Sequence, residues 1–176
     1  EIDFEVLIEA KKEMGTQLVG VVLIHPLGKA LDLSKVSELK EHYGLFVIED
    51  NAQAIGGSYT GADGVKKANG TMGDIGCTSF FPSKNLGCYG DGGAMYTNND
   101  ELATKCRMYS HHGSLKKHDH KIEGINSRLD SIQAAILDIK LKYIHDWTNK
   151  RQQIAQYYSD QLKDIGEIII PKIRNN

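Results

Sequence analysis

The sequences VIEDNAQAIGG, at residues 47–57, and TSFFPSKNLGCYGDGG, at residues 78–93, decide the fold of this chain. Each stretch opens with a strand-like run and then breaks into a turn of small and polar residues. The first run ends at the acid pair Glu49 and Asp50, and the turn after the second run carries Lys84. Because the carboxyl ends of parallel strands line one crevice of an open sheet, we expect Asp50 and Lys84 to converge there.

The composition argues against several classes of function. Of the 176 residues, 40% are hydrophobic and 25% are charged, which is typical of about one globular α/β domain. The net charge of -2 gives no electrostatic reason to bind nucleic acid or an anionic membrane. No apolar run approaches the roughly 20 residues that a bilayer span needs. We therefore expect a cytoplasmic protein with no nucleic-acid partner and no membrane partner.

A strand, a helix and a second strand precede the first decisive turn. Residues 18–24 form an apolar, β-branched run that is typical of a strand buried on both faces. The helix that follows has Asp32 or Ser34 as its N-cap and Gly44 at its left-handed C-terminal end. The next strand covers residues 45–48. A crossover of this length predicts two neighbouring parallel strands joined by a right-handed connection.

The other elements are read from their periodicity and turn residues. An amphipathic helix is expected at residues 1–15, and short strands are expected at residues 77–81 and 92–97. The Gly-rich connection between these two strands is too short for a parallel crossover unless the second strand pairs elsewhere. Three more helices are predicted, starting at Asn98 or Asn99, near Leu129, and at Asp146. The segments at residues 56–76 and 110–126 are predicted as turns and loop.

The apolar stripes of the last two helices lack an obvious partner surface. Leu129, Ile132, Ile136, Ile139 and Tyr143 mark the first stripe, and a second stripe follows it along residues 147–162. The chain starts at Glu1 rather than Met and stops just after a short β-branched run. We therefore interpret it as the middle of a longer polypeptide.

Metal and dinucleotide sites are not favoured. Three cysteines, an odd number without a CxxC pair, argue against a disulfide framework and a structural zinc site. A polar loop holds four histidines, which are His111, His112, His118 and His120. Neither a cysteine pair nor an HExxH helix accompanies them, so no metal is predicted. Contact with substrate is the preferred interpretation of this loop. The Gly-rich run at residues 87–93 does not fit GxGxxG.

Asp50 and Lys84 have the chemistry of a carbonyl-processing site. A nucleophilic amine must be held near the reaction centre and deprotonated, and a lysine in a tight turn at a strand end meets the first need. A carboxylate buried at a strand end needs a cationic partner, and a pyridinium nitrogen is one such partner. The alternatives are a solvated surface lysine and an aspartate that caps its turn.

Five motifs then occur in one order along nearly the whole chain: EDNAQ at residues 49–53, GDIG at 73–76, SFFPSKNLG at 79–87, GDGGA at 90–94, and NSRLD with QAA within 126–135. Together they resemble the DegT/DnrJ/StrS-type sugar aminotransferases. These pyridoxal-phosphate enzymes of the aspartate-aminotransferase fold aminate keto sugars on nucleotide carriers for amino-sugar and cell-surface polysaccharide biosynthesis.

The resemblance implies an α/β fold and a division of the chain. The fold would be the three-layer large domain of a pyridoxal-phosphate transferase, with a mostly parallel sheet and helices on both faces. Its N-terminal part and most of the small C-terminal domain would lie outside this chain. Residues 1–145 would belong to the large domain, and residues 146–176 would form a linking helix and the start of the small domain.

The resemblance also implies a role for each matched residue. Lys84 would form a Schiff base with the pyridoxal 5'-phosphate aldehyde and then act as the base, and Asp50 would pair with the pyridinium nitrogen. Ala52 would press on the face of the ring, and Gln53 would hydrogen-bond the ring hydroxyl. Ser79 would bind the phosphate from the end of its strand. Ordinary turn and strand-end packing is the alternative for these last three.

Asn126 implies a homodimer with shared active sites. In this family the matching asparagine reaches the cofactor phosphate of the neighbouring subunit, whereas the alternative makes Asn126 the N-cap of the following helix. Arg128 would bind substrate or brace the interface, and it is not included in the catalytic set.

The predicted function is a transaminase that passes an amino group from an amino-acid donor, glutamate or a similar one, to a nucleotide-linked keto sugar. The segment at residues 120–124 resembles the subgroup that aminates 3-keto N-acetylated UDP-sugars, but amination at the 3- or the 4-position stays open. A related sugar dehydratase would have histidine in place of Lys84. A non-catalytic or truncated relative that serves as a binding or regulatory module is the third hypothesis.

Overall fold

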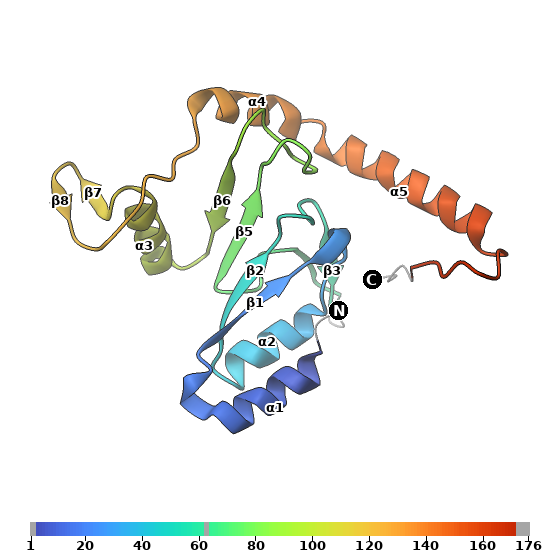
Figure 1. The fold of residues 1–176 in the computed structure, drawn as a ribbon, viewed down its shortest axis with the longest axis horizontal. Helices are drawn as coiled ribbons and strands as arrows, with labels where there is room; N and C mark the ends of the chain where they lie inside the picture. The colour runs from blue at the N-terminus through green and yellow to red at the C-terminus, as the bar shows by residue number, and fades with distance from the viewer. Residues whose placement is uncertain (1–2, 62–63, 172–176) are drawn as a thin grey trace.

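The computed structural model describes residues 3–61 and 64–171, which form a mixed sheet with helices around it (Figure 1). The principal elements, in chain order, are α1 Phe4–Met14, β1 Gly20–Ile24, α2 Leu33–Glu41, β2 Phe46–Asp50, β3 Ser58–Thr60, β4 Lys66–Ala68, β5 Ile75–Ser79, β6 Gly93–Tyr96, α3 Asp100–Ser110, β7 Ser114–Lys116, β8 Asp119–His120, α4 Ser131–Leu141 and α5 Ile144–Leu162.

The main sheet has the order β1-β2-β5-β6. β1 pairs with β2 in parallel, and β2 pairs with β5 in parallel, with Asp50 opposite both Ile24 and Cys77. β6 pairs with β5 in the antiparallel sense, so that Ser79 lies opposite Gly93. The short Gly-rich connection before β6 therefore joins neighbouring antiparallel strands, which need no crossover.

Helices α1 and α2 cover one face of β1 and β2, as Figure 1 shows. Leu23 and Val47 from the strands and Val36 and Leu39 from α2 are buried, and the predicted α1 residues Phe4, Leu7 and Ile8 pack against them. The N-caps are Asp3 and Asp32, whose carboxylates accept from backbone N–H groups of the first turns. The N-cap of α2 is therefore Asp32 and not Ser34.

The other face of β1 and β2 is more open in the described part of the chain. Val22 and Ile24 are 58% and 54% exposed, and Phe46 is 38% exposed. Successive side chains of a strand point to opposite faces, so buried Val47 and Glu49 point toward the helices. Asp50 belongs to the open face.

Two small hairpins lie where turns and loop were predicted. β3 pairs with β4, and β7 pairs with β8, both in the antiparallel sense. These strands have only two or three residues each, too few for a pattern of alternating hydrophobicity to mark them in the sequence.

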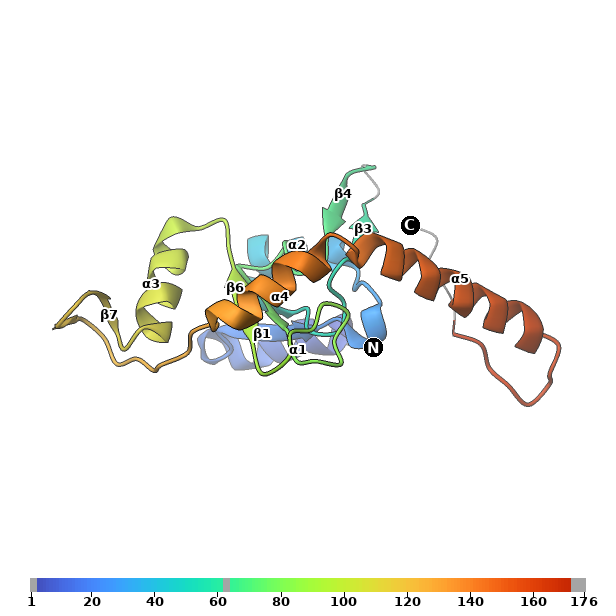
Figure 2. The ribbon, with the colours of Figure 1, turned by 90° about the horizontal axis from the view of Figure 1, so that it is seen from above.

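Helices α4 and α5 carry exposed apolar side chains, and α5 runs away from the sheet in both views (Figure 1 and Figure 2). Within the predicted stripe of α4, Ile132 is 73% and Ile139 is 60% exposed. The buried contacts of α4 are made instead by Leu137, together with Ile144 of α5. The domain boundary expected at residues 145 and 146 falls inside α5 and stays a prediction. None of the helices that the structure describes is long and apolar enough to cross a membrane.

Candidate active site

Asp50 ends β2 at the carboxyl edge of the parallel strands. Its Oδ1 accepts a hydrogen bond of 2.9 Å from the backbone N–H of Ala52, which starts the following turn. Burial, and after it the negative charge of Asp50, raise the pKa of the neighbouring Cys77 thiol. The carboxylate therefore lies at a strand end, beside Cys77.

Glu49, the preceding residue, is fully buried. Its Oε2 accepts from the backbone N–H of Gly70 at 2.8 Å, and its Oε1 accepts from Met72 at 2.6 Å and from Gly73. Burial alone would raise the pKa of this carboxyl, but the bonds from His25, Gly73, Gly70 and Met72 outweigh it and hold the pKa below its ordinary value. Glu49 therefore fixes the segment before β5 against β2.

His25 supplies the fourth hydrogen bond to Glu49, at 2.8 Å from its Nε2. The backbone N–H of Leu31 points at Nδ1 of the same ring, 3.2 Å away. Nδ1 must accept that bond, so the imidazole is the neutral tautomer with its proton on Nε2. This fully buried ring links the loop after β1 to β2.

Lys84 lies in the connection between β5 and β6, residues 80–92, which we call the lysine turn. The backbone N–H of Lys84 donates to Phe81 O at 2.9 Å. The turn is closed by Phe80 N to Gly92 O at 2.7 Å and by Cys88 N to Phe80 O at 2.8 Å. A Cβ added to Gly87 would lie 2.5 Å from Pro82 O, so the turn is too tightly wound there for a side chain.

The Lys84 side chain is half-buried. Across the described ranges, no hydrogen bond or ion pair engages its ammonium, and none joins it to Asp50. Ser79, at the base of the lysine turn, accepts from Phe81 N at 3.2 Å through its hydroxyl oxygen. The topology thus brings Asp50, Ser79 and the turn that carries Lys84 to the same carboxyl edge of the sheet. Asp50 and Lys84 do not touch there, and their convergence stays a prediction.

The turn after Asp50 holds Ala52 and Gln53, of which Ala52 is half-buried and Gln53 is exposed. Asn51 anchors this turn, because its backbone N–H donates to Cys77 O at 2.8 Å and its Nδ2 donates to Tyr96 Oη at 3.1 Å. A Cβ on Gly28 would lie 3.6 Å from Gln53 O, so the loop after β1 adjoins the turn. Ala52 and Gln53 are thereby placed beside Asp50.

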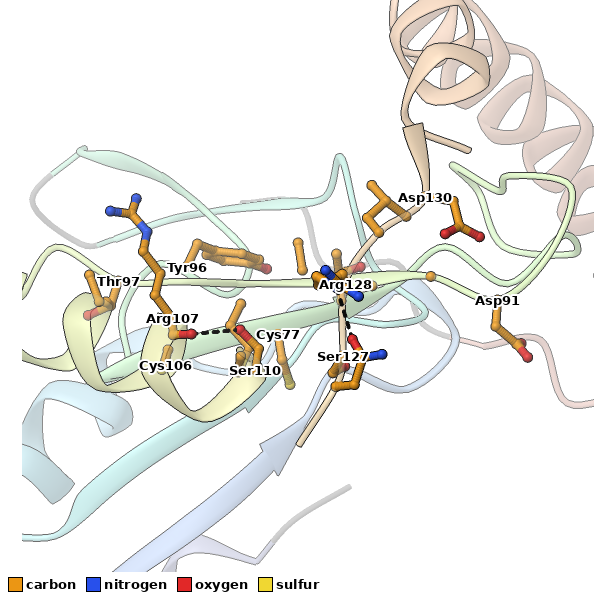
Figure 3. A pocket seen from close by; sticks show the side chains of 18 residues that line it. Cys77, Asp91, Tyr96, Thr97, Cys106, Arg107, Ser110, Ser127, Arg128 and Asp130 are labelled. Atoms are coloured by element: carbon orange, nitrogen blue, oxygen red, sulfur yellow. Dashed lines mark hydrogen bonds between the residues drawn. The ribbon is translucent and has the colours of Figure 1, made fainter. Parts of the chain in front are cut away.

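Asn126 lies elsewhere, on the wall of an open cavity of about 960 Å³ along β6 (Figure 3). Arg128, which lines the same cavity, donates from Nε to Asn126 Oδ1 at 2.9 Å. The N-cap alternative for Asn126 is wrong, because α4 begins at Ser131 with Asp130 in the cap position. Asn126 is exposed, and no hydrogen bond joins it to Asp50, Ser79 or Lys84 in the part of the chain that the structure describes.

The four loop histidines are all exposed and lie around the hairpin of β7 and β8. His120 Nδ1 donates to the backbone carbonyl oxygen of His112, 2.7 Å away, so this ring fastens the hairpin. In the described ranges, no three His, Cys, Asp or Glu side chains are grouped so that they could hold a metal ion.

Two residues of α4 that contact the lysine turn were missed by sequence reasoning. Gln133 Oε1 accepts from Tyr89 N at 2.7 Å, and Lys140 Nζ donates to Gly87 O at 2.6 Å. A signal was present, because these residues and the buried Leu137 and Ile144 follow one another at helical spacings of four, three and four. Because two of its four members are polar, this row is less apolar than the predicted stripe of α4.

A model of the DegT/DnrJ/EryC1/StrS aminotransferase family matches residues 5–176. The chain belongs to this family. The predicted resemblance is therefore confirmed.

Two similar relatives and one solved structure show the range of the family. The chain is 43% identical over 151 residues to a "Pleiotropic regulatory protein" of Geobacillus stearothermophilus, covering 85% of this chain and 39% of that protein. It is 42% identical over 160 residues to the UDP-2-acetamido-2-deoxy-3-oxo-D-glucuronate aminotransferase of Pseudomonas aeruginosa, and the match covers 91% of this chain and 43% of that protein. The crystal structure of a DegT DnrJ EryC1 StrS aminotransferase from Brucella abortus superposes with a TM-score of 0.89 at 37% identity, and this match covers 99% of this chain and 46% of that one.

The chain thus spans less than half the length of these relatives. The match to the Brucella abortus structure confirms the predicted fold class, the α/β large domain of a family aminotransferase.

Proposed function

We propose that the full-length protein is a pyridoxal 5'-phosphate-dependent aminotransferase that moves an amino group from glutamate, or a similar amino-acid donor, to a keto sugar on a nucleotide carrier. One observation carries the proposal. Asp50 and the lysine turn follow neighbouring parallel strands at one carboxyl edge, the place where open α/β sheets bind their ligands.

The residues at this edge fit the cofactor. Asp50 presents an oxygen, Oδ2, for which the described part of the chain supplies no hydrogen-bond donor, while Oδ1 is held by Ala52 N. Lys84 is half-buried, and its ammonium has no ion pair there. A carboxylate and an amine that protein groups leave available suit a ligand with a cationic nitrogen and an aldehyde.

Each residue then has a task. When bound, the cofactor supplies an aldehyde that carries the amino group and a ring that absorbs carbanion charge. Lys84 would hold it through its side-chain nitrogen and later move the proton at the donor α-carbon. Asp50 would keep the ring nitrogen protonated. Ala52 would limit the space above the ring, and Gln53 would donate to the ring oxygen.

Phosphate binding completes the site. Ser79 lies at the end of β5, with its hydroxyl oxygen accepting from Phe81 N, and would donate its own proton to the phosphate. Asn126 would reach the phosphate of the neighbouring subunit, so the working unit would be a homodimer. We place this enzyme in the cytoplasm. Residues 146–176 would lead into the small domain.

Borohydride reduction of the full-length enzyme tests the proposal. Reduction fixes an aldehyde cofactor to the amine with which it has condensed, so peptide mapping should find it on Lys84. Lys84→Ala should lose both this label and the transfer of nitrogen from glutamate to a panel of keto sugar nucleotides. Label on another lysine, or normal turnover by Lys84→Ala, would overturn the assignment.

The substrate panel should begin with UDP-linked 3-keto N-acetylated sugars. The Pseudomonas aeruginosa relative is named for such a substrate, and residues 120–124 resemble that subgroup. The second candidate function is a regulatory module, which the name of the Geobacillus stearothermophilus relative favours. The same panel distinguishes it from the aminotransferase. A full-length protein that binds cofactor on Lys84 but aminates none of the sugars would support the regulatory role.

A further inference from the structure

Helix α4 covers the lysine turn through a small apolar cluster. Leu86 and Cys88 of the turn are buried against Leu137 of α4 and Ile144 of α5. Ile55, from the turn after Asp50, packs against the same cluster. The cluster therefore connects both turns that carry candidate active-site residues.

Two polar contacts from α4 then hold the main chain of the lysine turn. Gln133 Oε1 accepts from Tyr89 N at 2.7 Å, and Lys140 Nζ donates to Gly87 O at 2.6 Å. Lys140 also lies over the ring of Tyr89, 4.7 Å from its centroid, within the range of a cation–π contact. Gly87 and Tyr89 are thus fixed from outside the turn, three and five residues beyond Lys84 in the chain.

The lysine turn has few other contacts that would fix its main chain to the rest of the protein. In the part of the chain that the structure describes, its remaining hydrogen bonds join residues of the turn to one another or to Ser79. Internal bonds fix the shape of a loop but not its position on the sheet. Gly87 is also buried and leaves no room for a Cβ beside Pro82 O, so a shift at Gly87 must be passed along the chain toward Lys84.

We propose that Gln133 and Lys140 are positioning residues that hold the lysine turn so that the Lys84 amine faces Asp50 and the cofactor. This inference rests on the proposed function of Lys84. Neither α4 side chain touches the reacting atoms. Their effect is to keep Lys84 in the conformation in which its amine meets the cofactor aldehyde, so that the two condense with loss of water.

The test uses the full-length enzyme with its cofactor removed. Lys140→Met keeps the aliphatic stem and removes the donor, and Gln133→Leu removes the acceptor for Tyr89 N. Each variant should attach added pyridoxal 5'-phosphate to Lys84 about 10- to 100-fold more slowly, judged by borohydride trapping at timed intervals and peptide mapping. Deuterium exchange of the peptide that spans residues 82–92 should rise by about 10-fold or more.

Matched variants separate positioning from general loss of stability. Lys142→Met removes a lysine of the same helical region that makes only an exposed 3.7 Å ion pair with Asp138, and it should attach cofactor at the wild-type rate. Lys140→Arg and Gln133→Glu keep the donor and the acceptor, and they should restore most of the rate. All variants are compared at equal folded fraction by circular dichroism.

The outcomes decide between two failures. If wild-type Lys84 is labelled and both Lys140→Met and Gln133→Leu attach cofactor at the wild-type rate, the positioning role is wrong while the proposed function stands. If Lys142→Met slows attachment as much as Lys140→Met, the effect belongs to the helix in general, and the inference is again wrong. If the wild-type enzyme carries no label on Lys84, the proposed function fails, and the positioning role fails with it.

Discussion

The side chains of Glu49 and Asp50, adjacent in the sequence, lie on opposite faces of strand β2. Glu49 is fully buried and accepts hydrogen bonds from three backbone N–H groups and the His25 ring. Asp50 stands on the open face and accepts from the backbone N–H of Ala52. One acid is therefore bound by the fold, and its neighbour is available to a ligand.

Glu49→Gln should destabilise the full-length protein. The amide keeps the size of the side chain but turns two N–H hydrogens toward donors that now lack an acceptor, which costs about 2–4 kcal/mol. The midpoint of urea unfolding measures the loss. Glu101→Gln, at an exposed pair with Lys105, is the control and should leave the midpoint unchanged. Equal midpoints for wild type and Glu49→Gln would contradict the role of Glu49.

The stability that Glu49 contributes should depend on pH with a definite sign. Its pKa in the folded protein lies below its ordinary value, so the contribution is complete above the unfolded pKa and is lost as the pH falls through the folded pKa. The difference in urea midpoint between wild type and Glu49→Gln should thus be constant near neutrality and shrink in acid. A difference that grows in acid would show that the sign is wrong.

Asp50→Asn should impair chemistry far more than folding. The amide oxygen can still accept from Ala52 N, but the charge that would keep the ring nitrogen protonated under the proposed function is gone. We expect the transamination rate to fall by about 100-fold or more while cofactor stays bound and the melting temperature stays within a few degrees. Single-turnover kinetics with glutamate measure the rate, and Asp100→Asn in the first turn of α3 is the control. A near wild-type rate would rule out the role of Asp50 as partner of the ring nitrogen.

Mixing Lys84→Ala with Asn126→Ala should restore activity if each site takes Lys84 from one subunit and Asn126 from the other. After subunit exchange about half of the dimers are heterodimers, each with one intact site, so activity should reach roughly a quarter of wild type. Each mutant alone must be nearly inactive, and exchange is shown with differently tagged subunits. Exchange without recovered activity would place Asn126 in the site of its own chain.

The strands, helices and caps near the site could be predicted because local chemistry specifies them. Each of α2 and α3 has two candidate N-caps in the sequence, and the structure has Asp32 and Asn99 in these positions. Both side chains carry an oxygen that accepts from the N–H groups of the first turn. The placement of Asp50 at a strand end followed from the apolar run before it. The parallel pairing of β1 with β2 followed from the length of their connection.

The helical spacing of Gln133 and Lys140 is visible in the sequence, but their partners in the lysine turn, like the pairing of His25 with Glu49, could not be predicted because they depend on long-range packing. His25 and Glu49 are 24 residues apart in the sequence, and no local pattern distinguishes a buried histidine from one in a loop. Lys140 reaches a carbonyl 53 residues earlier in the chain. Such polar partners become evident only when the sheet has set which segments adjoin.

The two hydrophobic clusters of the described chain share no residue, and this separation has a consequence for how the protein opens. The larger cluster joins α1 and α2 to β1 and β2, whereas the smaller one, of four buried side chains, holds the lysine turn under α4. A cooperative unit with so little buried apolar surface exchanges and unfolds at a lower free energy than the main core. Lys84 would thus reside in the unit that opens at the lower free energy, whereas Asp50 ends a strand that belongs to the more stable one.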